Sequence, residues 1–322
     1  AYIKSALNPD RITLGRRRRN EAFWPGIEQR HGVPRDILIG IWAQESGLGT
    51  ILGDRDVIRS MATLAADGRR RAWAEGELIA ALKIIASGEF PRAKLKGSWA
   101  GAMGQTQFIP STFLSTAVDG DGDRKRDIWA SSADALASAA NLLSKAGWRR
   151  GETWAREVAV PNGFDFSLTE GPRETPDWWT SRGVKRADGA AWSSADRSAP
   201  AQLLAPSGAT GPLFLLFPNH FAIRAYNNSA AYALAVGMLA DRFAGMGPLV
   251  RAWPEEIPLA LADRMAAQRA LARLGYDPGT PDGVVGVNTR SALRKWQQSR
   301  GLVADGYLSM DMVRSLRAAA GV

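Results

Sequence analysis

The chain has 322 residues, a formal net charge of +9 at pH 7, two histidines and no cysteine. This length predicts two or three domains. The composition excludes disulfide bonds and makes a zinc or cysteine-based redox site improbable. The positive charge favours an anionic partner, such as nucleic acid, acidic lipid or an acidic cell-wall polymer, but no zinc-finger or RNA-recognition pattern occurs. No run of about eighteen apolar residues occurs, so no membrane span is predicted.

Glu45 is the first residue of chemical interest, because it lies at the end of a helix predicted over residues 34–46. A proline starts this segment and a glycine follows it, as is typical of helix ends. Leu38, Ile41 and Trp42 share a helical face with Glu45. Burial on that face and the negative end of the helix dipole would both raise the pKa of Glu45, as a general acid requires. A glutamate that simply reaches water from a fraying helix end is the alternative.

The other elements follow from hydrophobic periodicity and turn residues. Helices are predicted in most of 1–31 and in 50–66, 74–87, 131–147 and 229–244. Short β-type runs at 156–160, 164–166 and 213–217 predict a small β-rich insertion over about 152–217. Four consecutive arginines, 16–19, predict either a solvated helix face or an anion-binding patch.

Residues 97–111, GSWAGAMGQTQFIPS, mix small residues with polar ones. Glycine and alanine allow close backbone approach, which a tight helix-packing seam would explain. Such a seam would not explain Ser98, Gln105 and Gln107 among them. A loop that lines a substrate site is therefore the second interpretation.

An acidic loop, DGDGDRKRDIWA, follows at 119–130. Its aspartates occupy positions 1, 3, 5 and 9 of a helix–loop–helix calcium loop, and they are Asp119, Asp121, Asp123 and Asp127. Position 6, normally glycine, is Arg124, and position 12, normally glutamate, is Ala130, with Asp134 as a possible substitute. A structural calcium ion and an acidic turn neutralised by its basic neighbours are both compatible with this pattern.

After a proline-bearing linker at 253–258, the C-terminal part predicts a small helical unit. Helices are expected at 261–274, 288–299 and 310–319. Two similar Asp-Gly turns, at 281–286 and 304–309, suggest an internal duplication.

Four segments in order, 41–47, 97–111, 119–129 and 226–233, resemble the lytic murein transglycosylases of the B type, which are bacterial cell-wall enzymes. Residues 259–320 resemble the peptidoglycan-binding module often fused to such enzymes, on the evidence of 268–271, 274–276, 282–286, 289–297 and 301–302. The resemblance implies an α+β, mainly α, fold with a lysozyme-like helical core. It implies a catalytic domain at 1–257, with the β-rich insertion inside it, and a three-helix peptidoglycan-binding domain at 258–322.

The same resemblance implies a reaction. Glu45 matches the family's acid, which protonates the oxygen between N-acetylmuramic acid (MurNAc) and N-acetylglucosamine (GlcNAc). The resulting carboxylate then takes the proton of the sugar's own C6 hydroxyl, so that a 1,6-anhydro end forms without water. The matching substrate-binding positions are Ser98, Met103, Gln107, Phe108, Tyr226, Asn227 and Tyr232.

The alternatives are a hydrolytic muramidase, with Asp54 or Asp56 as a second carboxylate, and a non-catalytic wall-binding scaffold. No cofactor is expected to be required, and a structural calcium ion is expected, if at all, at Asp119, Asp121, Asp123, Asp127 and Asp134. The expected partner is the peptidoglycan glycan strand, not nucleic acid, and whether cell-wall synthesis or division proteins are also partners is left open. The expected location is the periplasm of a Gram-negative envelope, where any outer-membrane anchor would precede residue 1.

Overall fold

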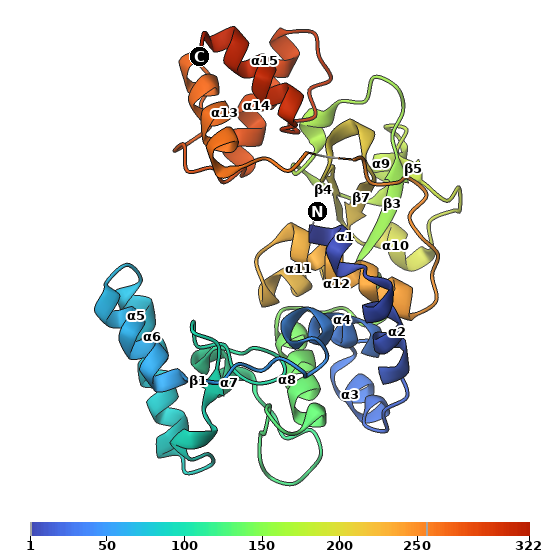
Figure 1. The fold of residues 1–322 in the computed structure, drawn as a ribbon. Coiled ribbons are helices and arrows are strands. Elements are labelled where there is room, and N and C mark those ends of the chain that lie inside the picture. Colours follow the sequence, from blue (N-terminus) through green and yellow to red (C-terminus); the bar gives the residue numbers. More distant parts are fainter. Residues whose placement is uncertain (1, 256) are drawn as a thin grey trace. The chain divides into compact units, whose positions relative to one another are not determined.

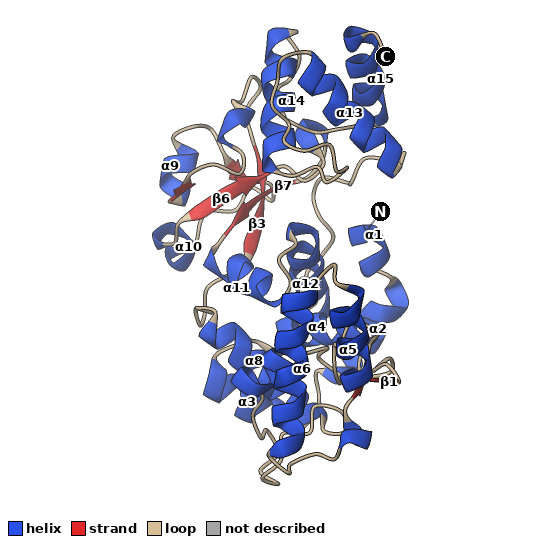
Figure 2. Cartoon of the chain, turned by 90° about the vertical axis from the view of Figure 1, so that its left-hand side faces the viewer, coloured by secondary structure: helices blue, strands red, loops and turns tan. Residues whose placement is uncertain are grey.

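The computed structural model describes residues 2–255 and 257–322, so that Ala1 and the linker residue Glu256 lie outside the described residues. Two compact units divide the chain. The core unit consists of Tyr2–Gly151 and His220–Gly247, and the β unit of Glu152–Asn219 and Pro248–Val322. Both units are drawn in Figure 1, and Figure 2 colours their helices and strands.

The core unit is almost entirely helical. Its helices are α1 (Tyr2–Ala6), α2 (Pro9–Arg18), α3 (Trp24–His31), α4 (Arg35–Ser46), α5 (Val57–Asp67), α6 (Arg71–Ala86), α7 (Pro110–Thr116), α8 (Ser132–Lys145), most of α11 (Pro218–Tyr226) and α12 (Ala230–Phe243). Two short strands, β1 (Arg55–Asp56) and β2 (Lys96–Gly97), pair antiparallel. The helices predicted from periodicity are confirmed, except that the one predicted at 50–66 begins only at Val57, where the Asp56 side chain caps it after strand β1. Ser131 and Ser229 cap α8 and α12 with their side chains.

Helix α4 packs closely against α12. A Cβ atom added at Gly40 would lie 2.8 Å from the Val236 carbonyl oxygen, so only glycine allows this approach. The face of α4 that carries Leu38, Ile41 and Trp42 is buried, as predicted. This packing fixes the helix whose last turn contains Glu45.

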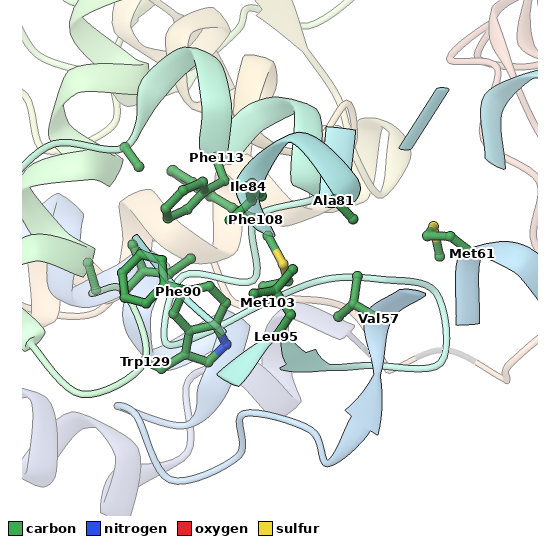
Figure 3. Packing of buried hydrophobic residues seen from close by; sticks show 13 residues of the cluster. Val57, Met61, Ala81, Ile84, Phe90, Leu95, Met103, Phe108, Phe113 and Trp129 are labelled. Atoms are coloured by element: carbon green, nitrogen blue, oxygen red, sulfur yellow. The ribbon is translucent and has the colours of Figure 1, made fainter. Parts of the chain in front are cut away.

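A second set of buried side chains forms a hydrophobic cluster that joins α5, α6 and α7 to the loops between them (Figure 3). Trp129 makes edge contact with Phe90 at 5.3 Å between ring centroids and a tilted contact with Phe113 at 5.8 Å. Met103 and Phe108 belong to the same cluster. Apolar side chains of the loop 97–108 therefore hold it against the hydrophobic cluster.

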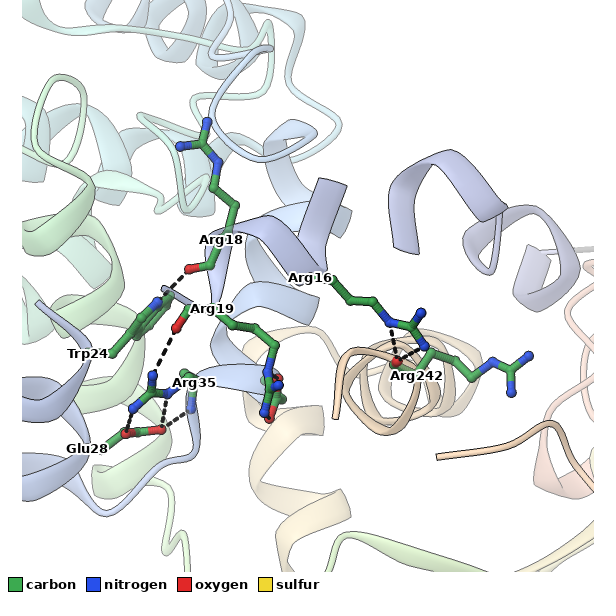
Figure 4. Close-up of polar contacts among 8 residues, drawn as sticks. Arg16, Arg18, Arg19, Trp24, Glu28, Arg35 and Arg242 are labelled. Atoms are coloured by element: carbon green, nitrogen blue, oxygen red, sulfur yellow. Dashed lines mark hydrogen bonds and ion pairs between the residues drawn. The ribbon is translucent and has the colours of Figure 1, made fainter. Parts of the chain in front are cut away.

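The arginine run has a structural role (Figure 4). Arg16 donates from Nε and Nη2 to the Arg242 carbonyl oxygen at 3.0 and 2.8 Å, at the C-terminal end of α12. Arg19 pairs with Asp36 at 2.7 Å, and Arg18 lies over the Trp42 ring. Three of the four arginines in this run thus hold helices together or pack on a ring. These contacts favour neither of the two predicted interpretations, a solvated face or an anion-binding patch.

In the β unit, an antiparallel sheet with the order β4-β6-β7-β3-β5 forms within the stretch predicted to be β-rich. The strands are β3 (Ala155–Ala159), β4 (Arg173–Glu174), β5 (Lys185–Arg186), β6 (Ala201–Leu204) and β7 (Leu213–Leu216). Two short helices, α9 (Pro176–Thr180) and α10 (Ser194–Ser198), complete the insertion. The strand predicted at 164–166 is wrong, because Asp165 accepts a hydrogen bond from the Ser167 amide and starts a 3₁₀ turn there.

The C-terminal module, also in the β unit, consists of α13 (Leu261–Arg273), α14 (Val287–Ser299) and α15 (Met310–Ala320). The predicted duplication is visible in its hydrogen bonds. Gln268 Oε1 accepts from the Gly283 amide at 2.7 Å, and Gln297 Oε1 accepts from the Gly306 amide at 2.8 Å. Each glutamine also donates from Nε2 to the aspartate that precedes its glycine. The two Asp-Gly turns are therefore held in the same way.

Candidate active site

Glu45 lies in the last turn of α4, which ends at Gly47 with a left-handed φ of 58°. The Glu45 side chain is partly buried. Burial raises the pKa of Glu45 from 4.5 to about 7, and the hydrogen bond from Tyr232 works in the opposite direction. The pKa of Glu45 is raised, as the apolar helix face predicted. Burial is the cause of the increase, and the Tyr232 hydrogen bond limits it.

The partner of Glu45 comes from α12. Tyr232 donates from its hydroxyl to Glu45 Oε1 at 2.5 Å, and its own side chain is almost fully buried. Burial, together with the charge of Glu45, raises the pKa of Tyr232 well above its usual value. Tyr232 is therefore a hydrogen-bond donor at neutral pH and never a base there.

Tyr226 stacks on Tyr232, with ring centroids 6.4 Å apart and planes 12° from parallel. Its hydroxyl donates to the Thr106 carbonyl oxygen, which ties the end of α11 to the loop 97–108. Burial and then the charge of Glu45 raise the pKa of Tyr226 well above its usual value. Asn227, the next predicted site residue, is exposed in the turn that follows α11.

Tyr2 is a residue that the sequence analysis missed. Burial, followed by the charge of Glu45, raises its pKa, so its hydroxyl lies within electrostatic range of that carboxyl group. The chain has five tyrosines, and the charge of Glu45 acts on three of them, on α1, α11 and α12. The only available signal was the rarity of tyrosine, since Tyr2 lies far from every matched segment.

Ser98 and Gln107 shape the loop 97–108. The Ser98 hydroxyl oxygen accepts hydrogen bonds from the amides of Ala100 and Ala102, at 3.3 and 3.1 Å. Gln107 has a left-handed φ of 51°, and its Nε2 donates to Gly104 O at 2.9 Å and to Leu52 O at 3.3 Å. Both side chains are only partly buried, so they hold the loop and still present surface beside it.

Met103 and Phe108 have a different environment. Their side chains are 0% and 2% exposed and pack in the hydrophobic cluster. Phe108 also contacts the Tyr226 ring, with centroids 5.8 Å apart. A side chain without exposed surface cannot touch a glycan, so these two predicted substrate contacts are corrected to supports of the loop and of Tyr226.

The acidic loop brings together three of its five predicted ligands. Within residues 2–255 and 257–322, oxygen atoms of Asp119, Asp121 and Asp134 lie within 4.8 Å of one another. Asp127 instead pairs with Lys94 at 3.4 Å and accepts from two amides that follow it. Asp123 accepts from the Lys125 amide at 2.8 Å. The carboxylates of Asp123 and Asp127 thus stabilise the backbone of the turn by accepting from its amides.

The loop geometry fits a hard cation in part. Arg124 has a φ of 69° at the position where a calcium loop has glycine, so the sharp turn is present despite the substitution. Asp134, however, already accepts from the amides of Gly120, Asp121 and Asp127. A calcium ion would be held by Asp119, Asp121 and the remaining lone pairs of Asp134.

Known proteins resemble this chain in sequence and in structure. The family described as "Transglycosylase SLT domain" matches residues 1–241, and "Putative peptidoglycan binding domain" matches residues 261–316. Membrane-bound lytic murein transglycosylase B of Escherichia coli strain K12 is 30% identical over 259 residues, which are 76% of this chain and 66% of that protein. The chain thus spans just under two thirds of that relative's length.

Two solved structures are informative. SltB3 from Pseudomonas aeruginosa, in complex with NAG-anhNAM-pentapeptide, is 47% identical, with a TM-score of 0.94 over 98% of this chain and 85% of that one. The Escherichia coli lytic transglycosylase SLT35 in complex with calcium is 30% identical, with a TM-score of 0.64 over 76% of this chain and 77% of that one. Within residues 2–255 and 257–322, no helix is both long and apolar enough to cross a bilayer. The family inferred from the sequence is confirmed: this chain belongs to the SLT-domain lytic transglycosylases, enzymes that act on peptidoglycan, and carries a peptidoglycan-binding domain at its C-terminal end.

Proposed function

We propose that this chain cleaves the β-1,4 bond between MurNAc and GlcNAc in peptidoglycan without consuming water, with Glu45 as its only acid and base. The observation that carries the proposal is the pKa of about 7 that burial gives Glu45 against the opposing hydrogen bond from Tyr232. A group with this pKa is available in both protonation states near neutral pH, as one residue with two successive roles requires.

In the first step, Glu45 gives its proton to the bridging oxygen as the bond from MurNAc C1 to that oxygen breaks. An oxocarbenium-like centre develops at C1. In the second step, the C6 hydroxyl oxygen of the same sugar bonds to C1, and its proton returns to the Glu45 carboxylate. The products are a GlcNAc hydroxyl and a 1,6-anhydro-MurNAc end, and the enzyme regains its initial protonation state.

Tyr232 contributes to both steps. Its hydrogen bond stabilises the carboxylate that forms when Glu45 has donated its proton, because a donor stabilises the charged form of its acceptor. It also holds the carboxyl group in one orientation, which favours proton transfer to a fixed point. Burial acts against the charged form, so the two influences together keep the pKa near neutrality.

A hydrolytic muramidase would need a second carboxylate near the sugar. The candidates from the sequence are otherwise engaged. Asp54 is 93% exposed beside Arg55. Asp56 caps α5 through the Arg59 amide and pairs with Arg92 at 3.0 Å. Neither figures among the causes that shift the pKa of Glu45.

The remaining assignments are parts of the same proposal. Ser98, Gln107, Tyr226 and Asn227 contact the glycan around the scissile bond, and the C-terminal domain, from residue 258, binds the cell wall. Peptidoglycan is located in the cell envelope, and we propose the periplasm as the place of action. A calcium ion bound by the acidic loop would be structural.

The test uses Glu45→Gln, with Asp54→Asn as a matched control that also neutralises one carboxylate. The products of intact sacculi are analysed by mass spectrometry. We expect anhydro ends from the wild type and the control, and no soluble products from Glu45→Gln, although this variant still binds sacculi. Exclusively reducing ends would establish the hydrolytic alternative, and normal turnover by Glu45→Gln would refute the role of Glu45.

A further inference from the structure

The β-rich insertion and the C-terminal module meet at Glu170. Arg290 pairs with this carboxylate through Nε, at 2.7 Å, and through Nη2. Arg294 donates from Nη2 to Glu170 Oε2 at 3.0 Å and to Thr169 Oγ1 at 2.8 Å. The Glu170 side chain is 14% exposed. Burial alone would raise the pKa of Glu170, but the two arginines hold it below its usual value.

A second contact joins the same two parts. The Ala209 amide, in the insertion, donates to Asp305 Oδ2 in the module at 2.9 Å. A Cβ atom added at Gly208, which has a φ of 66°, would lie 2.4 Å from that same oxygen. Only glycine therefore allows the approach. The insertion and the module are therefore in direct backbone-to-side-chain contact at Asp305.

The segment before the module is also fixed. The amides of Val250 and Arg251 donate to the two carboxylate oxygens of Glu157 on β3, at 2.7 and 2.8 Å. Trp253 stacks on Phe214 of β7, with ring centroids 6.1 Å apart. The sequence predicted a linker at 253–258. Residues 250–253 lie against strands β3 and β7, and we call the described residues 250–255 and 257 the strap.

An open pocket of about 450 Å³ lies on the module beside the Asp305 contact, and this volume is within the range of natural ligand sites. Thr210 comes from the insertion, Glu255 and Ile257 from the strap, and Leu302 and Val303 from the module. The module supplies most of the other lining residues. Ile257, Leu302 and Val303 are 65%, 46% and 59% exposed, so the pocket presents apolar surface that a ligand can cover.

The charge of the pocket is opposite to that of the chain. Three carboxylates, those of Glu255, Asp305 and Asp311, line it, and no lysine, arginine or histidine occurs among its described lining residues, although the net charge of the chain is +9. Asp305 is engaged with Gln297 and Ala209. Asp311 pairs with Arg314, in an exposed contact at 3.2 Å that contributes little stability and that a ligand cation can replace.

We propose that this junction pocket is a peptide-binding subsite, which takes a short peptide with apolar side chains and one free ammonium group. Glu170 is the positioning residue that holds the insertion and the module around it. The inference rests on the proposed function in one respect, that peptidoglycan supplies such a peptide attached to the glycan. The apolar wall binds the side chains of the peptide, and Glu255 and Asp311 bind its ammonium group.

Binding is measured on full-length Glu45→Gln, which does not consume substrate, by titration calorimetry. The probes are a synthetic tetrapeptide with one side-chain ammonium group and the same peptide with that amine acetylated. We expect saturable binding of the first and at least tenfold weaker binding of the second. Val303→Ser and Glu255→Gln should each weaken binding of the first at least tenfold. Val284→Ser, exposed on the module outside the pocket, is the matched control and should bind as the parent does.

Glu170→Gln tests the positioning role separately. Because the chain has no cysteine, spin labels can be placed at Ala190→Cys on the insertion and Ser315→Cys on the module. Glu170→Gln should broaden the distance distribution between the labels and weaken peptide binding, while Asp188→Asn, which breaks an ion pair inside the insertion, should do neither.

Three results of the binding measurements would overturn the proposal. They are equal binding by the pocket and control variants, equal binding of the acetylated and free peptides, and the absence of saturable binding. Failure of the proposed function would appear instead in the masses of the sacculus products.

Discussion

Tyr232 and Glu45 lie 187 positions apart in the sequence, and the tyrosine hydroxyl donates to the carboxylate at 2.5 Å. Two helices produce this contact, since α4 and α12 approach closely at Gly40. The hydrogen bond lowers the pKa of Glu45, whereas burial raises it to about 7. The pair therefore determines the pH at which the proposed acid loses its proton.

Tyr232→Phe should move the pH profile of kcat/KM upward. Glu45 must be protonated in the free enzyme, so kcat/KM falls as the pH rises through its pKa. Removal of a hydrogen bond that favours the carboxylate raises that pKa, so the falling limb shifts to higher pH. The rate should also decrease about tenfold or more, because the carboxylate that forms is less stabilised. Cleavage of a soluble glycan from pH 5 to 9 measures both effects.

Tyr226→Phe is the control for this prediction. It also removes one tyrosine hydroxyl beside Glu45, but that hydroxyl donates to Thr106 O. The falling limb should stay where it is in the wild type. A limb that moves equally in both variants would mean that the polarity of the cleft, and not the single hydrogen bond, sets the pKa.

Glu45→Gln should stabilise the protein at high pH and not at low pH. The folded-state pKa of about 7 exceeds the usual 4.5, so the folded state binds the proton more tightly than the unfolded state. The associated stability is fully present below about pH 4.5 and is lost as the pH rises through about 7. The loss approaches about 3 kcal/mol for a shift of this size. Glutamine carries no charge at any pH, so the variant does not undergo this loss of stability.

Thermal unfolding at pH 5 and pH 8.5 tests this sign. The difference in Tm between Glu45→Gln and the wild type should be larger at pH 8.5. Asp54→Asn changes an exposed carboxylate and should show no such trend. A Tm difference that is the same at both pH values would show that Glu45 does not titrate with a raised pKa.

Several parts of this site could be predicted from the sequence because local physics determines them. The apolar face of α4 indicates burial of Glu45, and burial accounts for its pKa. The Ser229 cap and the periodicity after it establish α12. The contact of Tyr232 with Glu45 depends instead on how two distant helices pack, which no local pattern records.

Other features were beyond prediction for different reasons. Met103 and Phe108 lie in a loop whose small residues suggested an open ligand surface, but the loop folds back so that both point into the core. Tyr2 reaches the site only through the packing of α1. The docking of the module depends on Glu170 and Asp305, single residues in turns, whose partners lie more than 90 positions away.

Asp134→Asn should destabilise the core unit by about 2–3 kcal/mol, since a buried carboxylate that accepts several hydrogen bonds is replaced by a group that also donates. Oδ1 of Asp134 accepts from the amides of Gly120 and Asp121, and Oδ2 accepts from the Asp127 amide. Asparagine keeps only one of these two oxygens and places an NH₂ group at the other position, so at least one of the three amides loses its acceptor. Asp123→Asn is the control, because that exposed side chain accepts from the Lys125 amide of the turn. Denaturant unfolding measures both variants. Equal stability of the two would mean that Asp134 does not organise the loop.

Calcium should raise the Tm of the wild type by a few degrees at millimolar concentration, as expected when a ligand binds weakly to the folded state alone. Magnesium should act less, because a loop of carboxylates suits the larger ion. Asp121→Asn should abolish the effect without a change in kcat, because the ion takes no part in the proposed chemistry. A calcium-dependent kcat would contradict the structural role.

Gln268→Ala and Gln297→Ala should have equal local effects and unequal distant ones. Each glutamine accepts from one turn amide, of Gly283 or Gly306, so each substitution should speed hydrogen exchange at its own glycine by an order of magnitude or more. Gln297 also donates to Asp305, whose other carboxylate oxygen accepts from Ala209 in the insertion. Gln297→Ala should therefore speed exchange at the Ala209 amide and loosen the docked module, whereas Gln268→Ala should leave that amide protected. Equal protection of Ala209 in both variants would show that Asp305 needs no support from Gln297 on α14 to hold the insertion.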